Sequence, residues 1–162
     1  MNTAIPISEF DEEMATTRRL VERVPSEKGE WRPHEKSFPL AHLTQLLSWM
    51  PSWISKSLTT TELDLAEGTG YSIETTGQLL RVFDQHVSQA RSDLESVTGS
   101  ALDVDWSLKV GDKLLATTPR GVVVRQHLNH LIHHRGQLSV YLRLLDVPLP
   151  SIYGPTADEG WS

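Results

Sequence analysis

The length of the last helical segment of this chain determines how long the fold has to be. It opens at Pro119, a favoured residue in the first turn of a helix, and runs through GVVVRQHLNHLIHHRGQLSVYLRLL to about Leu145. Pro148 and Pro150 do not allow the helix to continue. The segment PLPSIYGPTADEGW that follows is rich in proline and glycine, so we expect an extended tail that lies back over the helices.

Two earlier segments have the same helical period. The first runs from about Ile7 to Val24, and Pro33 lies in the loop that follows it. The second begins near Ser37 and continues through LAHLTQLLSW and SWISKSL. Pro51 stands between these two runs, and because the apolar pattern resumes after it, we expect Pro51 to bend the helix rather than end it.

A third helix is predicted after the connection at residues 59–71. SIET has the form of a capping box with Ser72 as N-cap and Thr75 in place of the usual glutamate, and Gly99 closes the helix. Short alternating runs on either side of Gly111 and Asp112 predict a small hairpin at residues 103–118. Four long amphipathic segments with one minor hairpin favour an all-α bundle, and we expect residues 1–162 to form a single domain.

Composition excludes several classes of function. The formal net charge is −6 and the acidic residues are spread along the chain, so no basic face for nucleic acid is expected. The chain has no cysteine, which excludes disulfides, thiolate metal sites and a catalytic cysteine. No secretory signal and no apolar run of about 18 residues is visible. We therefore expect a cytoplasmic protein with no membrane or nucleic-acid partner.

Four of the seven histidines lie in the eight residues HLNHLIHH, 127–134. On a helix with about 100° per residue, His127, His130 and His134 fall within about 60° of one another, while His133 points away. His130 and His134 have i,i+4 spacing, so both imidazoles can bind one ion. Imidazole ligands suit Zn, Ni, Cu or Fe(II), and the spacing does not choose among them.

Two histidines do not make a stable site, and a third ligand has to come from elsewhere. Three histidines are candidates for it: His42, His86 and His127. His34, beside Pro33, is less suited. The alternative is a set of core and surface histidines that bind no metal, in which case the buried imidazoles need other hydrogen-bond partners.

Four further residues have both a structural and a functional interpretation. Arg135 is expected either to pair with a carboxylate inside the bundle or, with Gln137, to orient an imidazole of the site. Trp49 and Trp53 stand one turn apart and are most simply core residues that line the mouth of a pocket.

The stretch NHLIHHRGQLSVYLRLLDVPLPSIYGPTADE resembles the C-terminal signature of the DinB family, in which a helix carrying HxxxHRGQ precedes a proline-rich tail. DWSLKVGDKLL, RPHEKSFPL and MPSWI are similar to landmarks of one DinB subgroup. The resemblance covers about Phe10 to Glu159. It implies an antiparallel four-helix bundle with a small hairpin between the third and fourth helices.

The resemblance also implies a divalent metal, commonly Zn or Ni, held by three histidines. Two of them correspond to His130 and His134, and the third belongs on the second helix. Aligned through MPSW, the position of that third histidine is occupied by Leu46, and His42 stands one turn earlier, about 5.4 Å away along the helix. We take His42 as the candidate third ligand, with His127 or a carboxylate as the alternative.

Relatives of this kind include transferases that use a small thiol cofactor such as bacillithiol or mycothiol, and metal-dependent hydrolases. The resemblance therefore implies a metal-dependent enzyme that acts on a small-molecule substrate. The competing hypothesis is a non-catalytic bundle, in the form of a homodimer, whose metal site is incomplete or lost. Leu46 at the expected ligand position motivates it.

Overall fold

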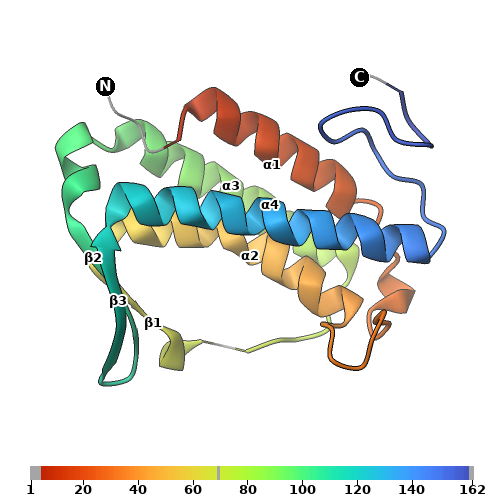
Figure 1. Ribbon diagram of the computed structural model, residues 1–162, viewed down its shortest axis with the longest axis horizontal. Helices are drawn as coiled ribbons and strands as arrows, with labels where there is room; N and C mark the ends of the chain where they lie inside the picture. The colour runs from red at the N-terminus through yellow and green to blue at the C-terminus, as the bar shows by residue number, and fades with distance from the viewer. Residues whose placement is uncertain (1–4, 69, 161–162) are drawn as a thin grey trace.

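The computed structural model describes residues 5–68 and 70–160 (Figure 1). Within this part of the chain the fold is mostly helical, with four α-helices and one small sheet. The helices are α1 (Ile7–Val21), α2 (Leu40–Thr59), α3 (Thr76–Ser96) and α4 (Arg120–Leu144). The four predicted helical segments are confirmed, and each boundary lies within a few residues of its expected position. None of the described helices is long and apolar enough to span a membrane.

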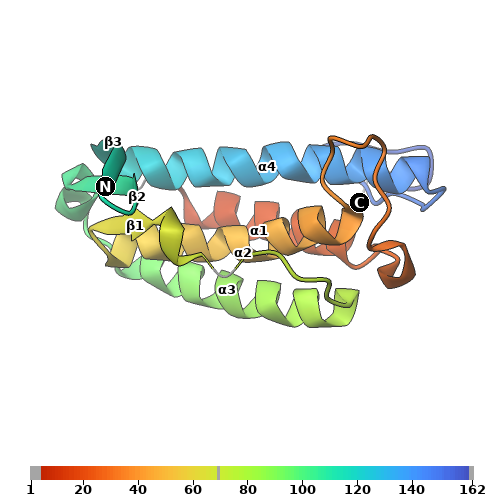
Figure 2. The ribbon, with the colours of Figure 1, turned by 90° about the horizontal axis from the view of Figure 1, so that it is seen from below.

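The four helices enclose one apolar core. α2 packs against α3 and α4, and α1 packs against the same two helices. Figure 2 shows α3 and α4 on opposite sides of the layer that holds α1 and α2. Two buried polar side chains of α2 are hydrogen-bonded within the helix itself: the Thr44 hydroxyl donates to the carbonyl oxygen of Leu40, and the Ser48 hydroxyl donates to that of Thr44. Because these hydroxyls need no partner from another helix, α2 can pack closely against its neighbours.

Pro51 lies inside α2, and the helix continues through it, as predicted. The start of α3 differs from the prediction. Its N-cap is Thr75, whose hydroxyl accepts from the backbone N–H of Gln78 while the Gln78 side chain accepts from the backbone N–H of Thr75. Ser72 instead forms hydrogen bonds with Gln45 of α2, so the three residues before the cap belong to the preceding connection.

The expected isolated hairpin is corrected to a three-stranded sheet. β2 (Asp105–Val110) and β3 (Lys113–Pro119) pair antiparallel around Gly111, whose φ of 54° suits glycine. β1 (Glu62–Asp64) joins them by pairing parallel to β2. This strand lies in the connection at residues 59–71, where no strand was predicted, because three residues are too few to show a period.

The tail after α4 is anchored on α1. Arg19 donates to the carbonyl oxygen of Ser151 and Arg23 to that of Pro148, and both guanidinium groups pair with Glu159. The expected return of the tail over the bundle is confirmed by these contacts. It places the tail on the side of α4 away from the sheet, as Figure 1 shows.

Candidate metal centre

His130 and His134 lie side by side on α4. Their Nε2 atoms are 2.9 Å apart and their ring centroids 4.6 Å apart. His134 is buried, with 8% of its surface exposed, and His130 faces solvent. Two imidazole nitrogens that each lie about 2.0–2.1 Å from one ion are separated by roughly 3 Å. The pair therefore has a spacing that fits a shared divalent ion.

Gln137 fixes the protonation of the His134 ring. Its Oε1 lies 2.7 Å from His134 Nδ1, and since an amide oxygen only accepts, Nδ1 carries the proton. Nε2 of neutral His134 is then an acceptor, and Nε2–H of His130 donates to it. The amide nitrogen of Gln137 donates to Nε2 of His133, 3.1 Å away. Gln137 thus holds His134 with its lone pair directed at His130, which supports an orienting role for Gln137.

The histidines on this face of α4 favour the neutral form. Burial lowers the pKa of His127 to about 4, and the nearby His130 acts in the same direction. Burial also lowers the pKa values of His130 and His134, and neighbouring imidazoles add to the effect. Neutral imidazole is the form that binds a metal, so these shifts leave the lone pairs available at neutral pH.

His42 does not lie with the pair. Its ring stacks on Tyr71, with centroids 4.5 Å apart and an interplanar angle of 16°, and contacts Phe38 at 4.4 Å. Phe38 also reaches His134, with a centroid separation of 6.4 Å. Among residues 5–68 and 70–160, no three His, Asp or Glu side chains come together as a possible metal-binding group.

The other histidines that the sequence suggested are held elsewhere. His86 donates through Nδ1 to the carbonyl oxygen of Ser48, 3.0 Å away, and His34 accepts from the backbone N–H of Lys36 in an exposed loop. His127 lies against Trp53 and Trp106, with centroids 5.8 and 6.3 Å away. Its Nε2 is buried without a hydrogen-bond partner in the described part of the chain.

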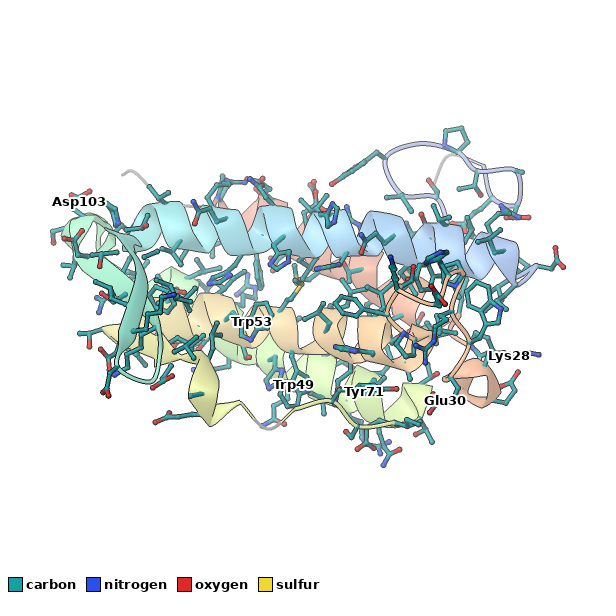
Figure 3. The ribbon with its side chains drawn as sticks, turned by 60° about the horizontal axis from the view of Figure 1, so that its bottom comes forward. Lys28, Glu30, Trp49, Trp53, Tyr71 and Asp103 are labelled. Carbon is teal, nitrogen blue, oxygen red and sulfur yellow. The ribbon has the colours of Figure 1, made fainter. Side chains whose placement is uncertain are left out.

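Aromatic side chains of α2 and of the β1–α3 connection border the site. A cavity of about 250 Å³ beside His42 is lined by Leu46, Trp49, Trp53 and Tyr71 among others. Figure 3 shows the two tryptophans and Tyr71 on the side of α2 that faces this connection. The Trp53 ring, which lines this cavity, has its centroid 6.0 Å from that of His130, whereas His130 and His134 themselves do not line the cavity. Trp53 also packs against the core, in line with the expected role at a pocket mouth.

Arg135 follows His134 and is almost fully buried, with 1% exposed. It pairs with Glu13 of α1 at 2.6 Å, which confirms the structural interpretation of this residue. It also donates to the Tyr153 hydroxyl, and its guanidinium lies 5.1 Å from the centroid of that ring. Arg135 thus ties the centre of α4 to α1 and to the tail.

Phe38 and Tyr71, the two residues that hold His42, were not predicted from the sequence. Both lie outside the helices, where no periodic pattern marks a residue as packed. Their only signal was the aromatic side chain in a polar loop, and that signal does not identify a partner.

This chain matches one family model and several solved structures. The family model described as DinB family matches residues 6–160. Among solved structures, a DinB-like protein from Bacillus subtilis is similar with a TM-score of 0.69 and 19% identity, covering 88% of this chain and 95% of that one. A DinB-like protein from Bacillus cereus is similar with a TM-score of 0.71 and 16% identity, covering 90% of this chain and 94% of that one. No curated protein matches this chain.

Proposed function

The chain belongs to the DinB family, and from this premise we propose that it is a metal-binding protein with a metal-dependent enzymatic function. The proposal takes the four helices as an antiparallel bundle of the DinB type. The packing of α2 and α1 against the same two neighbours supports it, because each helix of such a bundle contacts two others.

The observation that carries the proposal is the geometry of His130 and His134. Their Nε2 atoms are 2.9 Å apart, both rings favour the neutral form, and Gln137 keeps the proton of His134 on Nδ1. These two histidines would hold a divalent ion, Zn or Ni, and Gln137 would orient one of them. The donor set is all nitrogen, which suits both metals.

We assign His42 as the third ligand. It is located on α2, the helix that supplies the third histidine in the family pattern, and it shares its neighbour Phe38 with His134. To reach the pair, the His42 ring has to leave its stack with Tyr71. His127 or a carboxylate is the alternative third ligand, and metal that persists in His42→Ala would distinguish either of them from His42.

When bound, the ion would lower the pKa of a thiol or of a water molecule, which is the chemistry of a thiol transferase or a hydrolase. The chain's own residues would supply the apolar surroundings. Phe38, Trp53 and Tyr71 border the histidines, and their rings limit the access of bulk water to a small-molecule substrate. A low-molecular-weight thiol would be the cofactor of a transferase. We place the reaction in the cytoplasm.

A second candidate function is a non-catalytic bundle, as a homodimer, whose metal site is incomplete. One specific observation favours it: Leu46 occupies the position expected for the family's third histidine, and His42 is stacked between two aromatic residues. If this second candidate is correct, no metal ion replaces the hydrogen bond between His130 and His134.

Metal content of tag-free protein, measured by mass spectrometry after Zn or Ni reconstitution, tests the proposal. We expect near-stoichiometric metal in the wild type and in His34→Ala, the control for an exposed loop histidine, and loss in His130→Ala, His134→Ala and His42→Ala. Metal that persists in His42→Ala alone assigns the third ligand elsewhere. Wild-type protein that takes up no metal contradicts the proposal and favours the non-catalytic bundle.

A further inference from the structure

A cavity of about 480 Å³ lies on the side of α2 that faces the β1–α3 connection. Small-molecule sites in proteins have volumes of roughly 300–1,000 Å³. Trp49 and Trp53 line the cavity from α2, where they stand one turn apart, and Leu63 lines it from β1. The histidine pair of α4 is not part of its lining. The cavity is therefore a place for a small molecule that is distinct from the candidate metal centre.

The indole of Trp49 has faces that the chain itself does not cover. Trp49 is half-buried, and among residues 5–68 and 70–160 no aromatic ring and no cation stacks on it. The Trp53 ring, in contrast, contacts His127 and His130. An indole attracts a cation over its face more strongly than the other aromatic side chains do. The aromatic wall of the cavity is therefore suited to a ligand with a positive charge.

The charged side chains of the cavity favour the same sign of ligand. Two carboxylates line it, those of Asp64 and Glu67, against the one ammonium of Lys56. Neither carboxylate forms an ion pair with Lys56 or with any other described residue. Both charges act on Lys109, but its ammonium is already paired with Glu62. The cavity thus has an excess of negative charge that no residue lining it neutralises.

Asp64 and His86 have acceptor atoms that remain free. Oδ1 of Asp64 accepts from the backbone N–H groups of Ala66 and Gly111, both 2.9 Å away, and these hydrogen bonds lower the pKa of the carboxyl. Oδ2 of the same carboxylate has no partner in the described part of the chain. Nδ1 of His86 donates to the carbonyl oxygen of Ser48, which leaves Nε2 as an acceptor. A ligand that donates several N–H groups matches these acceptors.

We propose that this cavity binds an arylalkylamine in its ammonium form, with the aromatic body against Trp49 and Trp53 and the ammonium at Asp64 and Glu67. The inference goes beyond the proposed function, because it requires no bound metal. Lys56 opposes such a ligand, but it is exposed and its ammonium stands on a flexible stem, so it can turn into solvent. The cavity then discriminates against acids of the same shape.

Calorimetric titration of the full-length, metal-free protein with naphthylmethylamine tests this assignment. At about pH 7 the amine is protonated. We expect saturable binding of one molecule per chain. Two probes of the same shape serve as comparisons, the neutral naphthalenemethanol and the anionic naphthoate, and both should bind more weakly than the amine.

Substitutions in the cavity should act on the charge and on the aromatic wall separately. Glu67→Gln should weaken binding of the amine about threefold, as loss of an exposed charge pair does, and leave naphthalenemethanol unaffected. Lys56→Gln removes the opposing charge and should tighten binding of the amine by a similar factor. Trp49→Leu should weaken the amine and the alcohol alike. Glu35→Gln changes the net charge equally in an exposed loop outside the cavity, and as the matched control it should behave like the wild type.

Three results would overturn the assignment. These are the absence of saturable binding of the amine, naphthoate that binds at least as tightly as the amine, and equal affinity for the amine in Glu67→Gln and the wild type. Metal uptake is measured by mass spectrometry on separate samples of the same protein. Wild-type protein that binds the amine but takes up no metal contradicts the proposed function alone, and the reverse result contradicts this inference alone.

Discussion

His127 is a half-buried residue whose Nε2 is buried without a hydrogen-bond partner in the described part of the chain, and burial lowers the pKa of its imidazole to about 4. An unfolded histidine has a pKa near 6.5. Between these two values the unfolded chain binds a proton that the folded chain does not. The free energy of unfolding therefore falls as the pH falls from about 6.5 to about 4, and His127 contributes at most about 3 kcal/mol to that fall.

His127→Leu should remove this part of the pH dependence. We expect the variant to lose less stability than the wild type when urea unfolding is compared at about pH 7.5 and about pH 5, by about 2 kcal/mol. His34→Leu, which removes an exposed loop imidazole, is the control for the loss of a histidine as such. Equal pH dependence in His127→Leu and the wild type would contradict the prediction.

Gln137 is the other residue whose contacts have a measurable consequence. Gln137→Leu removes the acceptor that holds the proton of His134 on Nδ1. If the proposed site binds metal, we expect the affinity for Zn to fall by at least about tenfold, which is typical for loss of a group that orients a ligand. Competition with a chromophoric chelator measures this change. Gln126→Leu, exposed on the same helix, is the control, and an unchanged affinity in Gln137→Leu would exclude the orienting role.

At the residue level, the sequence predicted the His130–His134 pair because it depends only on helical spacing. The position of His42 depends on Phe38, which lies just before the start of α2, and on Tyr71, which comes from the β1–α3 connection. The contact with Tyr71 joins residues that are distant in sequence, so no local pattern predicts it. The cavity beside His42 could not be predicted for the same reason, since Gly70 and Tyr71 of the β1–α3 connection line it.

At the scale of elements, a buried ion pair joins α4 to α1. Arg135 and Glu13 have side-chain exposures of 1% and 13%. Removal of one partner leaves the other charge in an apolar region, which typically costs 3–5 kcal/mol. We expect Arg135→Met to lower the free energy of unfolding by about that amount in urea titrations.

Arg143→Met is the matched comparison on the same helix. Arg143 pairs with Asp158 at the surface, where solvent screens the interaction, so we expect nearly unchanged stability. A large loss in Arg143→Met, or none in Arg135→Met, would contradict this ranking. Restoring stability by combining Arg135→Met with Glu13→Leu would show that the uncompensated charge, rather than lost packing, causes the effect.

The helices could be predicted from the sequence, whereas the sheet could be predicted only in part. An amphipathic period over 15 to 21 residues identifies a helix such as α1 or α3 whatever its neighbours are. α4 is only weakly amphipathic, because its buried residues include His134 and Arg135, and prolines on either side marked its ends instead. β1 has three residues and exists because β2 lies beside it, with Leu63 opposite Leu108. The N-cap of α3 is Thr75 and not the predicted Ser72, because Ser72 forms hydrogen bonds with the side chain of Gln45 on another helix.

For the molecule as a whole, a ligand that binds only the folded state adds to its stability. At a free metal concentration of 100 times the Kd, the free energy of unfolding rises by about 2.7 kcal/mol. We expect Zn to raise the melting temperature of the wild type and not that of His134→Ala, and a chelator to reverse the rise. Differential scanning calorimetry measures both. The absence of any rise in the wild type would favour the non-catalytic alternative.

The anchoring of the tail has a consequence for synthesis of the chain. Glu13 is translated early, whereas Tyr153, which donates to Glu13 and accepts from Arg135, leaves the ribosome much later. Domains generally begin to fold from the N-terminal side as they emerge from the ribosome. Here, however, the buried charges of Glu13 and Arg135 lack the hydrogen bonds of Tyr153 until the tail has been synthesised. Chains stalled before Tyr153 should therefore remain sensitive to protease, and they are the species with which we expect chaperones to associate.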